Sequence, residues 1–219
     1  MLLGIFQRFD FLVFFVVALI IAITIHEFAH AWMATRLGDP TARAAGRLTL
    51  NPLSHLDPMG TILIFLVGFG WGKPVPYNPS FVRRGRFGEA LVAVAGPLAN
   101  ILTAFIFALP GRIYLINNQA LPESNIYVFL AIIVTLNIFL AAFNLIPIPP
   151  LDGSKILYLI LSSFGVSHYR IIWLEQMGPM LLLLMIFADR LIGTNILFTL
   201  LEPIIALIQW FVGSSTIPF

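Results

Sequence analysis

Two histidines and a glutamate interrupt an apolar stretch near the start of this chain. His26, Glu27 and His30 follow residues 11–25, a run in which Thr24 is the only polar side chain. Ionisable groups cost several kcal/mol at the depth of a membrane, so a chain that keeps three of them close together is expected to use them. A pair of core histidines bonded to backbone or to Glu27 is the weaker explanation.

The spacing of these residues is that of the pattern H-E-x-x-H. Histidines four residues apart lie on one helix face and can bind the same metal ion. A catalytic zinc site usually has three protein ligands and one open position for water. The carboxylate of Glu27, beside the first histidine, can reach that water without binding the metal. The pattern therefore predicts a zinc-activated water, with Glu27 as the group that accepts its proton.

A third ligand is expected in the stretch "PPLDGSK", where Asp152 follows a proline-rich segment. Prolines cannot sustain a regular helix. Irregular backbone at membrane depth is tolerated only where it is buried in protein or lines a wet cavity, which suits a segment that supplies a ligand. The alternative is that Asp152 is an ordinary N-cap of a following helix.

The elements that must position these groups are membrane helices. The chain has 219 residues, of which 59% are hydrophobic and 10% charged, whereas soluble domains carry about 25% charged residues. The composition predicts a single all-α polytopic membrane domain over residues 1–219. It comprises about five transmembrane helices, a re-entrant segment and short interfacial strands. Without cysteine the chain offers no thiolate metal ligand, and the first apolar run is too long for a signal-peptide core.

The first helix is predicted over residues 10–36, and Gly38-Asp39-Pro40 ends it. Residues 41–56 are expected to form short strands or loop at the interface, and residues 57–71 a short apolar segment. The remaining apolar runs are 88–110, 127–146, 171–188 and 191–212.

The distribution of basic residues predicts the topology. Seven of the twelve basic residues lie between positions 36 and 87: Arg36, Arg43, Arg47, Lys73, Arg83, Arg84 and Arg86. The positive-inside rule places the loops that carry them on the cytoplasmic side, so residues 57–71 must enter and leave by the same face. Five crossings result, with the N-terminus outside and the C-terminus inside.

This topology brings Asp152 to the same side of the membrane as the two histidines. With a rise of ~1.5 Å per residue from Phe11, His26 lies ~22 Å along the first helix. That position is roughly 8 Å short of the cytoplasmic edge of a ~30 Å hydrocarbon core. The predicted site is inside the membrane, near its cytoplasmic face.

Three motifs together resemble the site-2 protease family of intramembrane zinc metalloproteases. They are "HEFAH" (26–30), "GPLAN" (96–100) and "NLIPIPPLDG" (144–153), supported by Asn51-Pro52 and Asp57-Pro58. The resemblance covers roughly residues 20–160. It implies that His26, His30 and Asp152 bind Zn²⁺, that Glu27 is the catalytic base, and that the substrates are transmembrane segments of membrane proteins. With the H-E-x-x-H pattern at position 26, we expect no preceding helix and no PDZ or CBS module, so the resemblance is to a minimal core form.

Several other polar residues have two open interpretations. Asn144 could contact the substrate or the developing oxyanion, or bond to nearby backbone carbonyls. Asn100 could act beside the site in the same way, or mark interhelical packing with Gly96. His55 is expected to be a surface histidine, with a fourth metal ligand as the alternative. Glu202, which precedes a proline in the last apolar run, could mark a kink or a gate for substrates.

These observations predict an intramembrane zinc endopeptidase in the plasma membrane of a prokaryote, acting on transmembrane proteins. A metal transporter or metal-sensing membrane protein is the alternative, and a pseudo-enzyme that binds membrane partners is the third candidate. The basic loops are expected to contact anionic lipid headgroups, with no nucleic-acid partner, and the oligomeric state is left open. Residues 41–50 could pair with an unwound substrate as an added strand.

Overall fold

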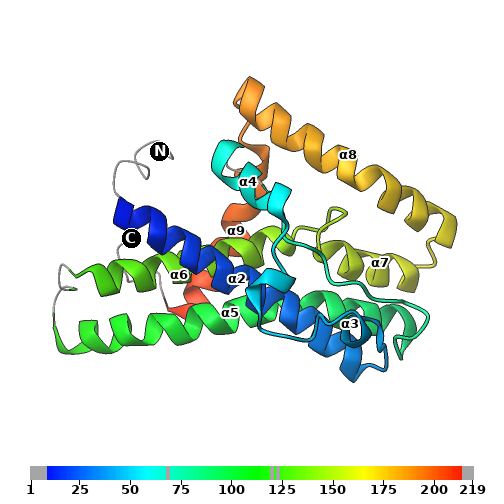
Figure 1. The fold of residues 1–219 in the computed structure, drawn as a ribbon. Helices are drawn as coiled ribbons and strands as arrows, with labels where there is room; N and C mark the ends of the chain where they lie inside the picture. Colours follow the sequence, from blue (N-terminus) through cyan, green and yellow to red (C-terminus); the bar gives the residue numbers. More distant parts are fainter. Residues whose placement is uncertain (1–8, 68–69, 119–120, 122–123, 214–219) are drawn as a thin grey trace.

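The computed structural model describes residues 9–67, 70–118, 121 and 124–213, and this part of the chain is helical (Figure 1). It contains no strand, and its β-pairing is one isolated bridge between Leu56 and Gly72. The elements are α2 (Phe9–Arg36), α3 (Thr41–Ala44), the 3-10 helix η1 (Pro52–Ser54), α4 (Pro58–Val67), α5 (Gly85–Asn117), α6 (Asn125–Asn144), α7 (Gly153–Ser163), α8 (His168–Ile192) and α9 (Ile196–Val212).

Four of the described helices are long and apolar enough to cross a membrane. They are α2, α5, α6 and the His168–Asp189 part of α8. The last apolar helix, α9, has 17 residues and is shorter than these candidates. The predicted class of helical polytopic membrane protein is therefore confirmed, with four candidate spans instead of about five.

Helices α2, α5 and α6 pack side by side and form the centre of the molecule (Figure 1). Their contact surfaces carry small side chains, and Ala18, Ala104, Ala141 and Ala142 are completely buried. Small residues let the axes of neighbouring membrane helices approach closely. This close packing brings polar groups of α5 within hydrogen-bond distance of the histidines on α2.

Of the two alternatives expected for residues 41–56, short strands or loop, the strands are not formed. These residues form α3, a turn and η1 instead. The carboxylate of Asp39 accepts hydrogen bonds from the backbone N–H and the hydroxyl of Thr41, at 2.9 and 2.5 Å, and the side chain of Asn51 accepts one from the N–H of Leu53. Such local bonds between side chain and backbone compete with strand pairing.

The segment around α4 leaves the bundle and returns to the point at which it left. Leu56 pairs with Gly72, and the N–H of Lys73 donates to the carbonyl of His55 at 2.8 Å. The buried Arg47 donates to the carbonyl of Lys73 at the same place, so this basic residue is not a lipid-facing one. The two ends of the segment therefore lie together.

The sequence predicted that the chain ends on the cytoplasmic side, where α2 ends. Helix α9 ends instead on the other side of the bundle, where α2 begins. α5 is antiparallel to α2, because His26 contacts Asn100 while His30, further along α2, contacts Val92. The guanidinium of Arg112, near the C-terminal end of α5, donates to the carbonyl of Val212 at 3.1 Å. Helix α9 thus ends towards the side at which α2 begins (Figure 1), since it packs back across α5 and α6.

The loop after α2 is held by the buried carboxylate of Asp39. Besides its two bonds from Thr41, it accepts one from the backbone N–H of Asn78 at 2.7 Å. Burial alone raises the pKa of the Asp39 carboxyl, but the bonds from Thr41 and Asn78 outweigh burial and hold this pKa below its ordinary value of 3.8. Asp39 therefore fastens the segment before α5 to the end of α2.

Replacement of Asp39 by alanine should lower the free energy of unfolding by about 1–3 kcal/mol at neutral pH, because three donors lose their acceptor. A carboxyl whose pKa is lower in the folded state stabilises the fold above its unfolded pKa and loses this effect on acidification. The difference in the free energy of unfolding between wild type and Asp39→Ala should therefore become smaller once the pH falls below 3.8. Thermal unfolding in detergent measures both proteins, and a gap that widens in acid would contradict this role.

Candidate metal centre

Three of the predicted site residues converge on one point. The Nε2 atoms of His26 and His30 lie 3.0 Å apart, and Oδ2 of Asp152 lies 3.2 Å from the first and 3.3 Å from the second. The two histidines come from adjacent turns of α2, and Asp152 comes from the residue before α7. Residues more than 120 positions apart in sequence thus form one compact donor group.

The other ring nitrogen of each histidine, Nδ1, forms a hydrogen bond with a residue of α5. Nδ1 of His30 lies 2.8 Å from the carbonyl oxygen of Val92, and Nδ1 of His26 lies 2.6 Å from Oδ1 of Asn100. Both partners are acceptors, so each Nδ1 carries the proton of its neutral ring. The lone pair of each imidazole is then at Nε2, and both lone pairs face Asp152.

This arrangement fits a divalent cation. Two nitrogen lone pairs and a carboxylate oxygen lie within 3.3 Å of one another, and Asp152 Oδ2 is buried with no hydrogen-bond donor. Three acceptors this close repel one another unless a cation lies between them. Tetrahedral zinc, at about 2.0–2.1 Å from its ligands, sets the ligand atoms about 3.3 Å apart. In the described part of the chain, this is the one group of at least three such residues that could hold a metal.

Asp152 owes its position to the turn between α6 and α7. α6 ends at Asn144, and the proline-containing turn returns to pack Gly153 against the preceding backbone, where a Cβ would lie 2.2 Å from the carbonyl oxygen of Leu145. Asp152 is the N-cap residue of α7, yet its side chain makes no capping hydrogen bond. The N-cap alternative therefore explains its backbone position but not the direction of its carboxylate.

The "GPLAN" stretch of α5 lies against the histidines. A Cβ added to Gly96 would come within 2.3 Å of His30 Nε2 and 2.7 Å of His26 Cε1. Asn100, one turn later on the same helix face, is completely buried and bonds to His26. Asn100 thus contacts a histidine of the site and also bonds to the neighbouring helices α2 and α6, so both interpretations of this residue stay open.

The carboxylate of Glu27 faces residues 73–78, a segment without regular secondary structure. Its Oε2 accepts a hydrogen bond from the backbone N–H of Val75 at 3.0 Å, and a Cβ on Gly72 would lie 3.7 Å from Oε1. The far end of this segment is fastened by the bond from Asn78 to Asp39. The backbone segment that contacts Glu27 is thus residues 73–78.

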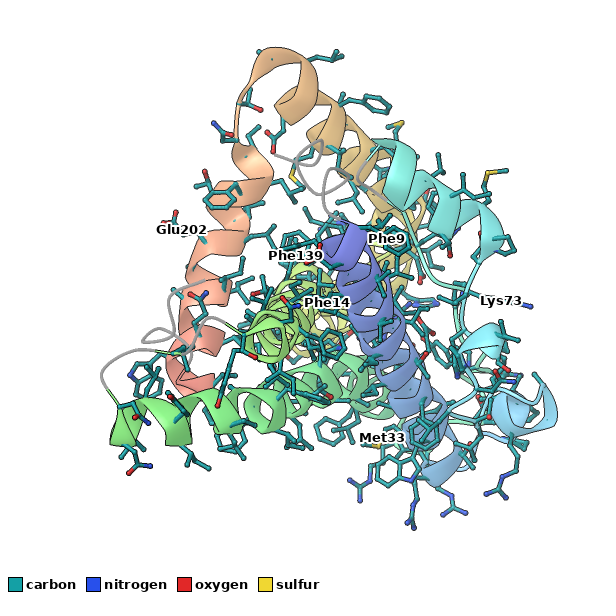
Figure 2. The ribbon with its side chains drawn as sticks, turned by 60° about the vertical axis from the view of Figure 1, so that its left-hand side comes forward. Phe9, Phe14, Met33, Lys73, Phe139 and Glu202 are labelled. Atoms are coloured by element: carbon teal, nitrogen blue, oxygen red, sulfur yellow. The ribbon has the colours of Figure 1, made fainter. Side chains whose placement is uncertain are left out.

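The remaining candidates lie outside the donor group. The amide of Asn144 donates to the carbonyl of Leu140 in its own helix at 3.0 Å. His55, expected at the surface, is completely buried and bonds through Nε2 to the carbonyl of Thr49 at 2.7 Å, because it packs inside the base of the α4 segment. Glu202 is exposed on α9 and points away from the other helices (Figure 2).

One polar residue beside the site was missed from the sequence. Asn137 on α6 is completely buried and accepts a hydrogen bond from the amide of Asn100 at 2.7 Å. The signal was available, because polar residues inside apolar membrane helices tend to be functional or to bind a neighbouring helix. The partner of Asn137, Asn100, could be identified only from the packing of α5 against α6.

An H-E-x-x-H helix whose histidines meet a carboxylate defines the class of zinc metalloproteases. The model of peptidase family M50 matches residues 14–116 and 108–185, and because these ranges cover most of the sequence, the chain belongs to this family. The resemblance to site-2 proteases is thereby confirmed, and Zn²⁺ is the cofactor that the family and the donor group imply.

Relatives named as zinc metalloproteases occur in bacteria and archaea. The chain is 38% identical over 191 residues to a Bacillus subtilis protein provisionally named zinc metalloprotease YwhC, covering 81% of this chain and 87% of YwhC. It is 32% identical over 139 residues to the similarly named Rip2 of Mycolicibacterium smegmatis, covering 61% of this chain and 52% of Rip2. Zinc metalloprotease MJ0392 of Methanocaldococcus jannaschii is 24% identical over 147 residues, 67% of this chain and 34% of MJ0392. No solved structure matches the chain.

Substitution of Gly96 by alanine tests the close approach of α5 to the histidines. The added methyl group overlaps both imidazoles, so we expect at least a tenfold loss of zinc affinity, as for other changes that displace a ligand. Chelator competition on the folded protein measures this affinity. Leu98→Ala, at an exposed position in the same turn of α5, is the control and should bind zinc normally; equal affinities for the two variants would contradict the role of Gly96.

Proposed function

We propose that this protein is an intramembrane zinc endopeptidase that hydrolyses peptide bonds in transmembrane segments of other membrane proteins. In this proposal His26, His30 and Asp152 are the zinc ligands and Glu27 is the catalytic base. The main support for this proposal is that lone-pair-bearing atoms of His26, His30 and Asp152 lie close together. The two histidines belong to an apolar helix that is long enough to span a membrane. Membership of a peptidase family supports it independently.

Each group of the chain has a defined task in this reaction. Zinc, when bound, would lower the pKa of a water molecule and polarise the scissile carbonyl. Glu27 takes a proton from that water and returns it to the leaving amine. The N–H of Val75 holds one carboxylate oxygen of Glu27, which leaves the other free to meet the water. Asn100 and the carbonyl of Val92 keep the two imidazoles oriented.

The substrate must present an unwound peptide bond, because a carbonyl within a helix is already hydrogen-bonded. An extended peptide can lie against an extended backbone and bond to it. Residues 73–78 lie directly beside Glu27, but residues 74 and 76 are prolines, and the N–H groups of Val75 and Asn78 already donate to Glu27 and Asp39. We therefore place the substrate there, with its own N–H groups donating to backbone carbonyls of this segment, instead of along residues 41–50. This relocation keeps the strand-addition hypothesis and changes the segment on which it depends.

The proposed location is the plasma membrane of a prokaryote, with the active site near the cytoplasmic face. Arg36 ends α2, and Arg83 and Arg84 directly precede α5, so that exposed basic side chains gather at one end of the bundle. His30 lies six residues before Arg36, about 9 Å along the helix. The positive-inside rule assigns that end to the cytoplasm. The orientation remains part of the proposal and follows from these charges.

A metal transporter or sensor would use the same donors differently. A transit path needs polar ligands at several depths of the membrane, whereas the described residues offer one such donor group. Glu27, which is not a member of that group, has a task in proteolysis and none in transport.

The variant Glu27→Gln separates the two functions. It should bind zinc as wild type does and cleave a panel of labelled single-span helices in liposomes about 100- to 10,000-fold more slowly, because general-base catalysis is lost. Glu202→Gln, which makes the same chemical change on the outer face of α9, is the matched control and should cleave normally. Cleavage that survives in Glu27→Gln, or zinc uptake into the liposomes by both variants, would refute the protease proposal.

A further inference from the structure

A buried amide on α6 is connected to the metal centre through a second amide on α5. Nδ2 of Asn137 donates to the carbonyl of Ile133 at 2.8 Å, and Oδ1 of Asn137 accepts from Nδ2 of Asn100 at 2.7 Å. Nδ2 of Asn100 also donates to the carbonyl of Ala22 at 3.0 Å, and its Oδ1 lies 2.6 Å from Nδ1 of His26. Both asparagines are completely buried.

In this series of hydrogen bonds, each donor and acceptor is fixed by the one before it, from the carbonyl of Ile133 to the ring of His26. A backbone carbonyl can only accept, so the carbonyl of Ile133 fixes the NH₂ end of Asn137 and turns its oxygen towards Asn100. That oxygen, together with the carbonyl of Ala22, takes both amide protons of Asn100. Oδ1 of Asn100 is then the atom left for His26, whose Nδ1 must carry the proton. The lone pair of His26 is thereby held at Nε2, where the metal binds.

We propose that Asn137 is a positioning residue for metal binding that acts through Asn100 on the tautomer of His26. This inference rests on the proposed role of His26 as a zinc ligand. Without Asn137, the amide of Asn100 keeps only Ala22 as an anchor and can rotate to turn Nδ2 towards His26. Nδ1 of His26 would then accept a hydrogen bond, and its proton would move to Nε2 and block the ligand position.

A purely structural role of Asn137 predicts a different result. A hydrogen bond between two membrane helices contributes modestly to their association, and its loss would lower stability without changing the zinc affinity of molecules that remain folded. The zinc affinity of the folded protein therefore distinguishes positioning from packing. The order of the hydrogen bonds adds a second criterion, because Asn137 acts on His26 only through Asn100. Its replacement should therefore have no effect on zinc affinity once Asn100 is removed.

The test is a double-mutant cycle on the full chain in detergent, with zinc affinity measured by chelator competition. Asn100→Leu should weaken zinc binding about 10- to 100-fold, as partners of metal-bound histidines typically do, and Asn137→Leu about three- to tenfold because one anchor remains. The double variant should bind zinc as Asn100→Leu does, since the two residues act in series. The absorption bands of bound Co²⁺ should change in Asn137→Leu in the same direction as in Asn100→Leu.

Two further variants control the cycle. Asn137→Asp keeps an oxygen facing Asn100, and its buried carboxyl, protonated, donates to the carbonyl of Ile133 in place of the amide, so this variant should restore affinity to within about twofold of wild type. Thr103→Val removes a buried hydroxyl that bonds only to the carbonyl of Ala99 in its own helix, and it should leave zinc binding unchanged. If Asn137→Leu does not fold, Asn137→Ser takes its place, because the shorter side chain cannot reach Asn100.

Wild-type zinc affinity in folded Asn137→Leu or Asn137→Ser would overturn the inference. So would losses that add in the double variant, because Asn137 would then act independently of Asn100. Neither result touches the proposed function, which would fail instead if the wild-type protein bound no zinc or cleaved no membrane substrate.

Discussion

The mutual repulsion of three acceptor atoms is the constraint on which the rest of this structure depends. Two imidazole lone pairs and a carboxylate oxygen lie within 3.3 Å of one another, in surroundings that exclude most water. Such a group is unfavourable in an apolar bundle unless a cation neutralises it. Metal binding and the packing of the helices that carry the donors are therefore expected to stabilise each other.

Helix α5 makes this arrangement possible without contributing a ligand. Gly96 lets its backbone come within contact distance of both imidazoles, and Asn100 and the carbonyl of Val92 fix the proton of each ring. Because these contacts occupy the face of α5 towards α2, the helix can shift very little without disturbing the site. Asn137 extends the same network to α6, so three helices take part in orienting one histidine.

Much of the metal centre could be predicted from the sequence, because two of its ligands carry a local signal and the third follows from the topology. The spacing of His26 and His30 is sufficient to place both on one helix face, and the topology argument brought Asp152 to the same end of the bundle. The tautomer network could not be predicted in this way. Interhelical packing was the more common interpretation of Asn100, and Asn137 had no visible partner, since the bonds between α2, α5 and α6 depend on how closely the helices pack.

The fold was predictable in class but not in its irregular parts. Hydropathy identified the long helices, whereas the side-chain bonds of Asp39 and Asn51 decided that residues 41–56 do not form strands. His55 was assigned to the surface because it lies in the basic interfacial region, although the return of the chain at Gly72 buries it. The direction of α9 depended on its packing and on Arg112, and charge counting did not reveal either.

The metal content of the purified protein tests the central claim most directly. Mass spectrometry of the intact chain, prepared in detergent without chelators, should find about one zinc per molecule, because a site with three protein ligands binds a single ion. Zinc should be absent from His26→Ala, His30→Ala and Asp152→Ala that remain folded. A folded wild-type protein without zinc, or an Asp152→Ala variant that keeps it, would contradict the account of this site.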